Sequence, residues 1–130
     1  MSGGKVSAVR FLPIIKDCVK ASLKAEEAGE YTALLRTISN LCLDEQCRYQ
    51  IVNLKGVEVL VKMLEIGESN GNVELQRACS KGLLNLSISS REVKARVLGS
   101  IEGILDRYYK GRLDPVAASY IEGILKAPKT

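Results

Sequence analysis

The sequence predicts an all-α protein built from repeated helical units. Three observations favour this class: apolar residues recur at helical spacing, two segments repeat one another, and no segment alternates apolar and polar residues as a strand does. The chain has 130 residues, of which 46% are hydrophobic, and it contains no Trp and a single Phe. We therefore expect one domain over residues 1–130 with a core that is mainly aliphatic.

The first unit is expected over residues 7–43. It consists of a medium helix at about 7–24 and a long helix that ends near Cys42. Pro13 falls inside the first apolar run, where a proline either kinks a helix or marks its start. Both alternatives stay open for this boundary.

The second unit, 44–88, has the clearest pattern. A short helix at 48–52 precedes Gly56, and a medium helix follows. Its apolar residues form a single helical stripe: Val57, Leu60, Val61 and Leu64. Residues 67–71, Gly-Glu-Ser-Asn-Gly, have the composition of a loop, and Asn72 suits the N-cap of a long third helix.

The third unit, 89–126, repeats this order. A short helix at 94–98 leads to Gly99, and an apolar run at 101–105 follows. Asp114 followed by Pro115 marks the start of the last helix, because a cap residue stands before a proline at the first helical position. We expect Gly56 and Gly99 each to lie just past a helix end in the left-handed conformation.

A short phrase occurs near the end of both long helices. RTISNL, residues 36–41, matches KGLLNL, residues 81–86, in its basic residue, its Asn and its final Leu. Asn is a mediocre helix former, so its presence at equivalent places in two helices calls for a reason. The basic residues, Arg36 and Lys81, precede Asn40 and Asn85 by four positions and therefore share a helical face with them.

This three-helix unit resembles the armadillo repeat family over roughly residues 7–126. Helical repeats of the HEAT type share the period, but the Gly before the second helix and the Asn-Leu phrase favour armadillo. The resemblance implies a right-handed superhelix of about three stacked three-helix repeats. The matching residues are Ile51, Val52, Gly56, Val57, Leu60, Val61, Met63, Leu64, Ala78, Leu83, Asn85 and Leu86, with Ala33, Ile38, Asn40 and Leu41 in the earlier copy.

The resemblance also implies a function. In armadillo proteins the long third helices line a concave groove that binds an extended peptide, and helix asparagines hydrogen-bond its backbone; the equivalent positions here are Asn40 and Asn85. Nuclear-import receptors of the family usually carry Trp four residues earlier, whereas this chain has Arg36 and Lys81. A groove lined in this way is similar to the basic groove of β-catenin and would attract an acidic peptide.

Another interpretation of the same residues stays open. Arg36 and Lys81 would then be solvated surface residues, and the asparagines would cap helices or bridge neighbouring repeats. The third unit carries no equivalent amide, because Tyr120 stands near the basic position and Ile124 near the Asn. With scarcely three units, one end of the stack is expected to expose apolar surface, which favours a homo-oligomer or the continuation of a longer solenoid.

Several chemistries are disfavoured by the composition. The chain has no His, which excludes Ser-His-Asp and Cys-His catalysis, and it has no phosphate-binding glycine motif. We expect no enzymatic activity, cofactor or metal. Four cysteines are expected to be reduced and mostly buried, with Cys47 partly exposed and open to oxidation. They are Cys18, Cys42, Cys47 and Cys79.

Charge and hydropathy limit the partners further. The net charge of +4 is spread along the chain, and neither a membrane-spanning run nor a signal peptide is evident, which predicts a cytoplasmic or nuclear protein away from membranes. Nucleic-acid binding through a set of basic residues is the main alternative. Phe11 is the only aromatic residue among them, so the rings on which bases would stack are lacking. The basic residues are Lys5, Arg10, Lys16, Lys20 and Lys24. A third alternative is an assembly segment that contacts partners through its repeat ends.

Overall fold

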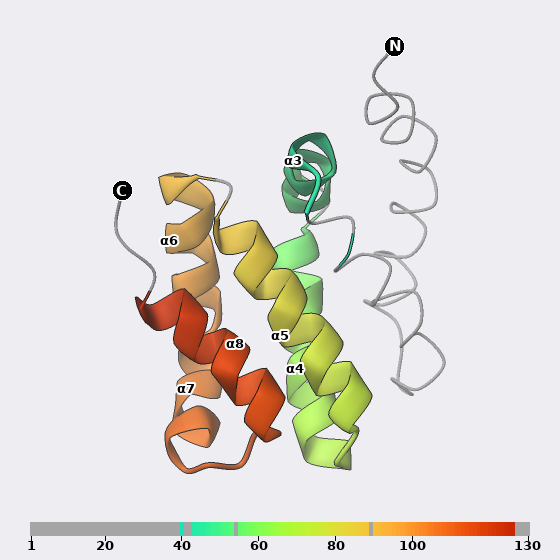
Figure 1. The fold of residues 1–130 in the computed structure, drawn as a ribbon, viewed down its shortest axis with the longest axis vertical. Coiled ribbons are helices and arrows are strands. Elements are labelled where there is room, and N and C mark those ends of the chain that lie inside the picture. The colour runs from blue at the N-terminus through green and yellow to red at the C-terminus, as the bar shows by residue number, and fades with distance from the viewer. Residues whose placement is uncertain (1–39, 41–42, 54, 89, 127–130) are drawn as a thin grey trace.

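A computed structural model describes residues 40, 43–53, 55–88 and 90–126 (Figure 1). From residue 43 onward these form six helices and no strand, which confirms the all-α class for this part of the chain. The helices are α3 (Glu45–Asn53), α4 (Gly56–Asn70), α5 (Val73–Ser87), α6 (Arg91–Ser100), α7 (Glu102–Tyr109) and α8 (Pro115–Lys126). None of them is long and apolar enough to cross a membrane. Almost all of the first unit, 7–43, lies outside the described residues.

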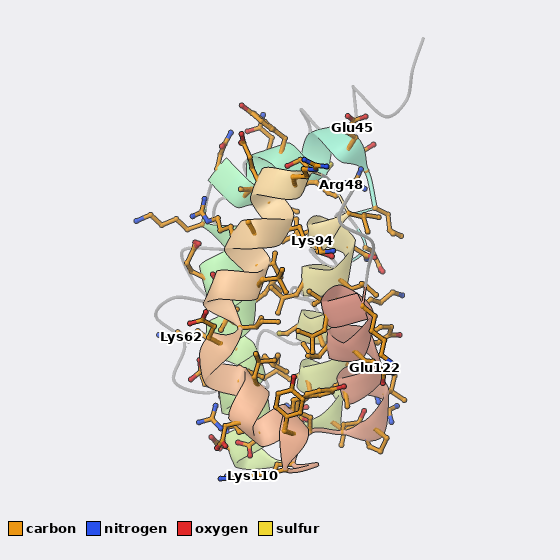
Figure 2. The ribbon with its side chains drawn as sticks, turned by 90° about the vertical axis from the view of Figure 1, so that its left-hand side faces the viewer. Glu45, Arg48, Lys62, Lys94, Lys110 and Glu122 are labelled. Atoms are coloured by element: carbon orange, nitrogen blue, oxygen red, sulfur yellow. The ribbon has the colours of Figure 1, made fainter. Side chains whose placement is uncertain are left out.

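The helices from α4 to α8 lie in two layers. α5 and α8 form one layer, and α4 together with α6 and α7 forms the other, as the edge-on view shows (Figure 2). The core lies between the layers and is aliphatic, as the sequence predicts, and each fully buried Leu or Ile contributes about 1.5–3 kcal/mol through the hydrophobic effect. Its largest fully buried side chains are Ile51, Leu60, Met63, Leu64, Leu75, Leu83, Leu86, Ile101, Ile104 and Ile121.

The helix starts follow local hydrogen bonds. The Oδ1 of Asn72 accepts from the backbone N–H of Leu75 at 3.0 Å, which confirms the predicted N-cap of α5. At the start of α8, Oδ2 of Asp114 accepts from the N–H groups of Val116 and Ala117 at 3.0 and 3.1 Å. Both caps could be predicted from the sequence because a cap residue and the N–H groups that it binds lie within three residues of each other.

Gly56 and Gly99 differ from the prediction. α4 begins at Gly56 itself, and the left-handed residue before it is Lys55, with φ of 63°. Gly56 is required by a close approach instead, because a Cβ there would overlap Cγ2 of Ile51 and lie 2.7 Å from its carbonyl oxygen. Gly99 lies inside α6 in open space. The prediction of a left-handed glycine was therefore wrong at both positions.

Among the glycines that the structure describes, the left-handed ones are Gly71 and Gly111, with φ of 66° and 69°. At Gly71 the backbone N–H bonds the carbonyl of Glu68, and the next N–H bonds the carbonyl of Gly67, which is a Schellman ending for α4. The predicted loop at 67–71 is consequently helical as far as Asn70. Packing outweighs composition there, since Gly67 is buried and a Cβ on it would lie 3.2 Å from Cγ of Gln76.

The second and third units, 44–88 and 89–126, are not copies of one another. α3 is seen end-on in Figure 1 and lies across the end of α4, whereas α7 runs on from α6 with Ile101 between them. The carbonyl of Ile101 accepts from the N–H of Leu105 at 3.2 Å, and its own N–H donates to the carbonyl of Val97 at 3.0 Å. Helical hydrogen bonding thus continues through this junction, so that α6 and α7 of the third unit approach one continuous helix.

Charged pairs join the two units. Arg96 of α6 contacts Glu58 of α4 at 2.7 Å, and Arg112 contacts Glu68 of α4 at 2.8 Å. In this layer α4, from the second unit, supplies the carboxylates, and the third unit supplies the guanidinium groups. In the other layer the second unit supplies the guanidinium group and the third unit the carboxylate, because Arg77 of α5 is bonded to Asp114. The position of α5 relative to α8 is therefore set by polar contacts as well as by the aliphatic core.

Candidate functional site

One face of α5 combines a cation, an amide and apolar side chains. Lys81, Leu84, Asn85 and Ile88 lie within two turns of each other at the C-terminal part of the helix, and we call these four residues the outer face of α5. Lys81 and Leu84 are half-buried, whereas Ile88, at the C-cap, is 61% exposed. The rest of the helix circumference is largely buried in the core. Near the start of α5, Val73, Glu74 and Arg77 are also exposed, so the outer face is the accessible part of the C-terminal half of the helix.

The four residues predicted as a binding site occupy different places. Lys81 and Asn85 lie one turn apart on α5, so the structure brings these two together. Asn85 is only 8% exposed, which leaves a small part of its surface to a ligand. Asn40 is a separate, exposed helical residue before α3, and its carbonyl accepts from the N–H of Leu43 at 3.1 Å. Arg36 lies outside the described residues.

Lys81 and the neighbouring cation on α5 differ in their partners. Within residues 43–53, 55–88 and 90–126, Lys81 has no ion pair. Arg77, one turn earlier, donates from Nε and Nη2 to the two carboxylate oxygens of Asp114 at 2.8 and 3.1 Å. The Arg77 hydrogen bonds, with help from the N–H of Ala117, hold the pKa of Asp114 below its usual value. Lys81 is consequently the cation that remains available to a ligand.

The helix beside α5 shapes the same surface. A Cβ on Gly123 of α8 would lie 3.3 Å from Cδ1 of Leu84, so α8 approaches α5 closely at this point. Tyr120 of α8 is half-buried and lies near enough to Arg77 to affect its pKa, which is raised mainly by the hydrogen bonds to Asp114. Ile124, at the position equivalent to Asn85, is fully buried in the core. α8 thus borders the site with an aromatic ring and no amide.

The buried thiols follow the prediction in part. Cys47 and Cys79 are free and buried. The prediction that Cys47 is partly exposed was wrong, because this residue of α3 is only 2% exposed. Burial, followed by its hydrogen bond with Asp44, raises the pKa of Cys47 to about 11, and burial likewise raises that of Cys79. Neither is a reactive thiolate near neutral pH. Cys18 and Cys42 lie outside the described residues.

Sequence reasoning missed the polar residues that fix this surface. Gln76 and Arg77 contact Asp114, which lies 38 and 37 positions away, and such pairings leave no local signal. The helical spacing of Arg77 and Lys81 is the one feature that could have drawn attention to Arg77. Within the described part of the chain, no group of three or more Cys, Asp or Glu side chains is arranged to hold a metal ion.

Comparison with protein-family models, with curated proteins and with solved structures found no match for this chain.

Proposed function

We propose that this chain is a non-catalytic protein-interaction scaffold of the armadillo type, which binds an extended, acidic peptide along the outer face of α5. The observation that carries the proposal is the placement of Lys81, which has no ion pair within the described residues, beside the Asn85 amide. The ammonium group attracts a ligand carboxylate, and a side-chain amide is of the kind that can hydrogen-bond a peptide unit. Together these groups favour an extended acidic segment over a basic one.

Apolar contact supplies the remaining part of the proposed recognition. Leu84 and the exposed Ile88 flank the polar pair on the same helix. A ligand that covers Ile88 removes its apolar surface from water, which contributes about 25 cal/mol for each Å² buried. The binding energy would then come mainly from this apolar contact, while Lys81 would select for charge and accelerate association.

The helix arrangement supports the armadillo assignment in part. α3, with nine residues, is shorter than α4 and α5, which have 15 residues each, and α5 and α8 lie side by side in one layer (Figure 1). Third helices of consecutive armadillo repeats line a groove in this way. The nearly continuous course of α6 and α7 departs from that pattern. The assignment therefore rests on the second unit, 44–88, and on the repeated Asn-Leu phrase.

A direct test uses three fluorescent probes: an oligoglutamate peptide, an oligolysine peptide and a single-stranded oligonucleotide. We expect the protein to bind oligoglutamate and to reject oligolysine. Nucleic-acid binding, the alternative, would instead appear as oligonucleotide affinity that falls by orders of magnitude between about 50 and 200 mM salt. A preference for oligolysine or for the oligonucleotide would contradict the proposal.

The asparagines can be tested separately from charge. Asn85→Ala, alone and combined with Asn40→Ala, should weaken oligoglutamate binding without a marked fall in melting temperature. Asn70→Ala, at the exposed end of α4, removes the same group elsewhere and serves as the control. If Asn85→Ala lowers the melting temperature markedly or leaves binding unchanged, the asparagine is a structural bridge and the groove assignment is wrong.

A further inference from the structure

Two cations lie one turn apart on α5, and one of them is already bound to a carboxylate. Arg77 and Lys81 are separated by four residues, a spacing that places Cβ atoms about 5–6 Å apart. The Arg77 side chain is 48% exposed and bonds both carboxylate oxygens of Asp114, in the paired geometry that arginine uses to recognise carboxylates. Its place on α5 therefore suits it to bind an acidic ligand, but the group bound there belongs to the chain itself.

Asp114 is held in this place by several contacts. Its Oδ2 also accepts from the N–H groups of Val116 and Ala117 in the first turn of α8. Its backbone N–H donates to Oε1 of the buried Gln76 at 2.8 Å. Both the backbone and the carboxylate of Asp114 are therefore hydrogen-bonded, and these bonds hold the carboxylate beside Arg77.

We propose that Asp114 is an internal competitor for the acidic ligand: its carboxylate occupies the edge of Arg77 that a ligand carboxylate would otherwise bind, so that Lys81 alone recognises ligand charge. This inference rests on the proposed function of the outer face of α5. It limits the specificity of the site to a single acidic side chain. In an extended peptide, side chains two residues apart lie about 7 Å from one another, close to the Cβ spacing of about 5–6 Å between Arg77 and Lys81. A second acidic residue at that distance consequently adds little to the affinity of the peptide.

Asp114→Asn tests the competition with little change to the helix start, because Asn and Asp are comparable N-cap residues. The substitution removes the negative charge and releases Arg77. We expect oligoglutamate to bind Asp114→Asn about two- to fivefold more tightly than it binds the wild type at low salt, the range expected for one exposed ion pair. Adding Arg77→Ala to the Asp114→Asn protein should abolish the gain.

Asp106→Asn is the matched control. Asp106 lies on α7 in the other layer and is paired with Lys110 at 3.1 Å, so its substitution makes the same change in net charge and also releases a cation. We expect Asp106→Asn to bind oligoglutamate with the wild-type affinity. If Asp106→Asn and Asp114→Asn raise the affinity for oligoglutamate equally, the effect comes from net charge and the competition is overturned.

The outcomes separate this inference from the proposed function. If the wild type binds oligoglutamate and Lys81→Ala weakens binding, but Asp114→Asn gains nothing, the competition is overturned and the proposed function stands. If only Asp114→Asn binds, the competition stands and binding by the native protein is overturned. If neither binds, both are overturned. Should Asp114→Asn fail to fold, Arg77→Ala decides: it should weaken binding much less than Lys81→Ala does, and an equal loss overturns the competition.

Discussion

The side-chain oxygen of Gln76 accepts a hydrogen bond from the backbone N–H of Asp114 at 2.8 Å, across 38 residues of sequence. The same side chain donates from Nε2 to the carbonyl of Gly67 at 3.2 Å. One buried amide of α5 therefore links the end of α4 to the start of α8. This link fixes the place where Asp114 meets Arg77 and, with it, the position of α8 beside the outer face of α5.

Gln76→Ala should destabilise the fold. It leaves the N–H of Asp114 without this partner, and an unsatisfied buried group costs roughly 1–3 kcal/mol, whereas the carbonyl of Gly67 keeps its hydrogen bond from the N–H of Asn72. Urea unfolding followed by circular dichroism measures the change in the free energy of unfolding. Gln50→Ala, at a half-buried position of α3, is the control and should change it by less than about 0.5 kcal/mol. Equal effects of the two substitutions would show that the link contributes nothing.

Substitution by alanine should have opposite effects on stability at Gly56 and at Gly99. At Gly56 the added methyl group would overlap Ile51, so Gly56→Ala should destabilise the protein by about 1–3 kcal/mol. At Gly99, inside α6 and with no atom within 4 Å of a Cβ, alanine should be neutral or stabilising by up to about 1 kcal/mol. Melting temperatures of the two variants provide the comparison. A similar shift in both would contradict the packing described for Gly56.

These glycines also illustrate what the sequence could and could not predict. The caps at Asn72 and Asp114 were predictable because they act within three residues, and the helical class followed from apolar spacing. The role of Gly56 depends on where α3 crosses α4, and the partner of Arg77 depends on how α8 returns to α5. For the candidate site, helical spacing alone placed Lys81 and Asn85 on one face. The near burial of Asn85 depends on packing that the spacing does not contain.

The carboxylate of Glu68 should matter more than that of Glu65. The Glu68 side chain is 3% exposed and lies 2.8 Å from Arg112 and 3.6 Å from Arg107, whereas that of Glu65 is 45% exposed and 3.7 Å from Arg107. Glu68→Gln removes the buried carboxylate that pairs with Arg112 and one of the two carboxylates beside the partly buried Arg107, and should cost about 1–3 kcal/mol of unfolding free energy. Glu65→Gln should cost less than about 1 kcal/mol. If the order is reversed in urea unfolding, Glu68 is not the centre of this charged group.

The thiol of Cys47 should resist alkylation until the protein unfolds. Its pKa is raised to about 11 from 9.0, so at pH 8 the folded protein holds about 100-fold less thiolate there than the unfolded chain. The unfolded state releases this proton first, and the contribution of Cys47 to stability therefore falls as the pH rises from about 9 to 11. Mass spectrometry of the Cys47 peptide after iodoacetamide treatment, with and without urea, measures the rates. Equal rates in both conditions would contradict the burial.

The most direct test of the central claim is the affinity of labelled oligoglutamate for Lys81→Glu compared with Lys62→Glu. Lys62 is an exposed lysine of α4 that extends on the side of the other layer (Figure 2), so the two substitutions change the net charge equally and differ in place. If the outer face of α5 binds acidic peptides, Lys81→Glu should lose at least about tenfold in affinity, while Lys62→Glu should stay within about twofold of the wild type. Equal losses, or no loss in Lys81→Glu, would contradict it.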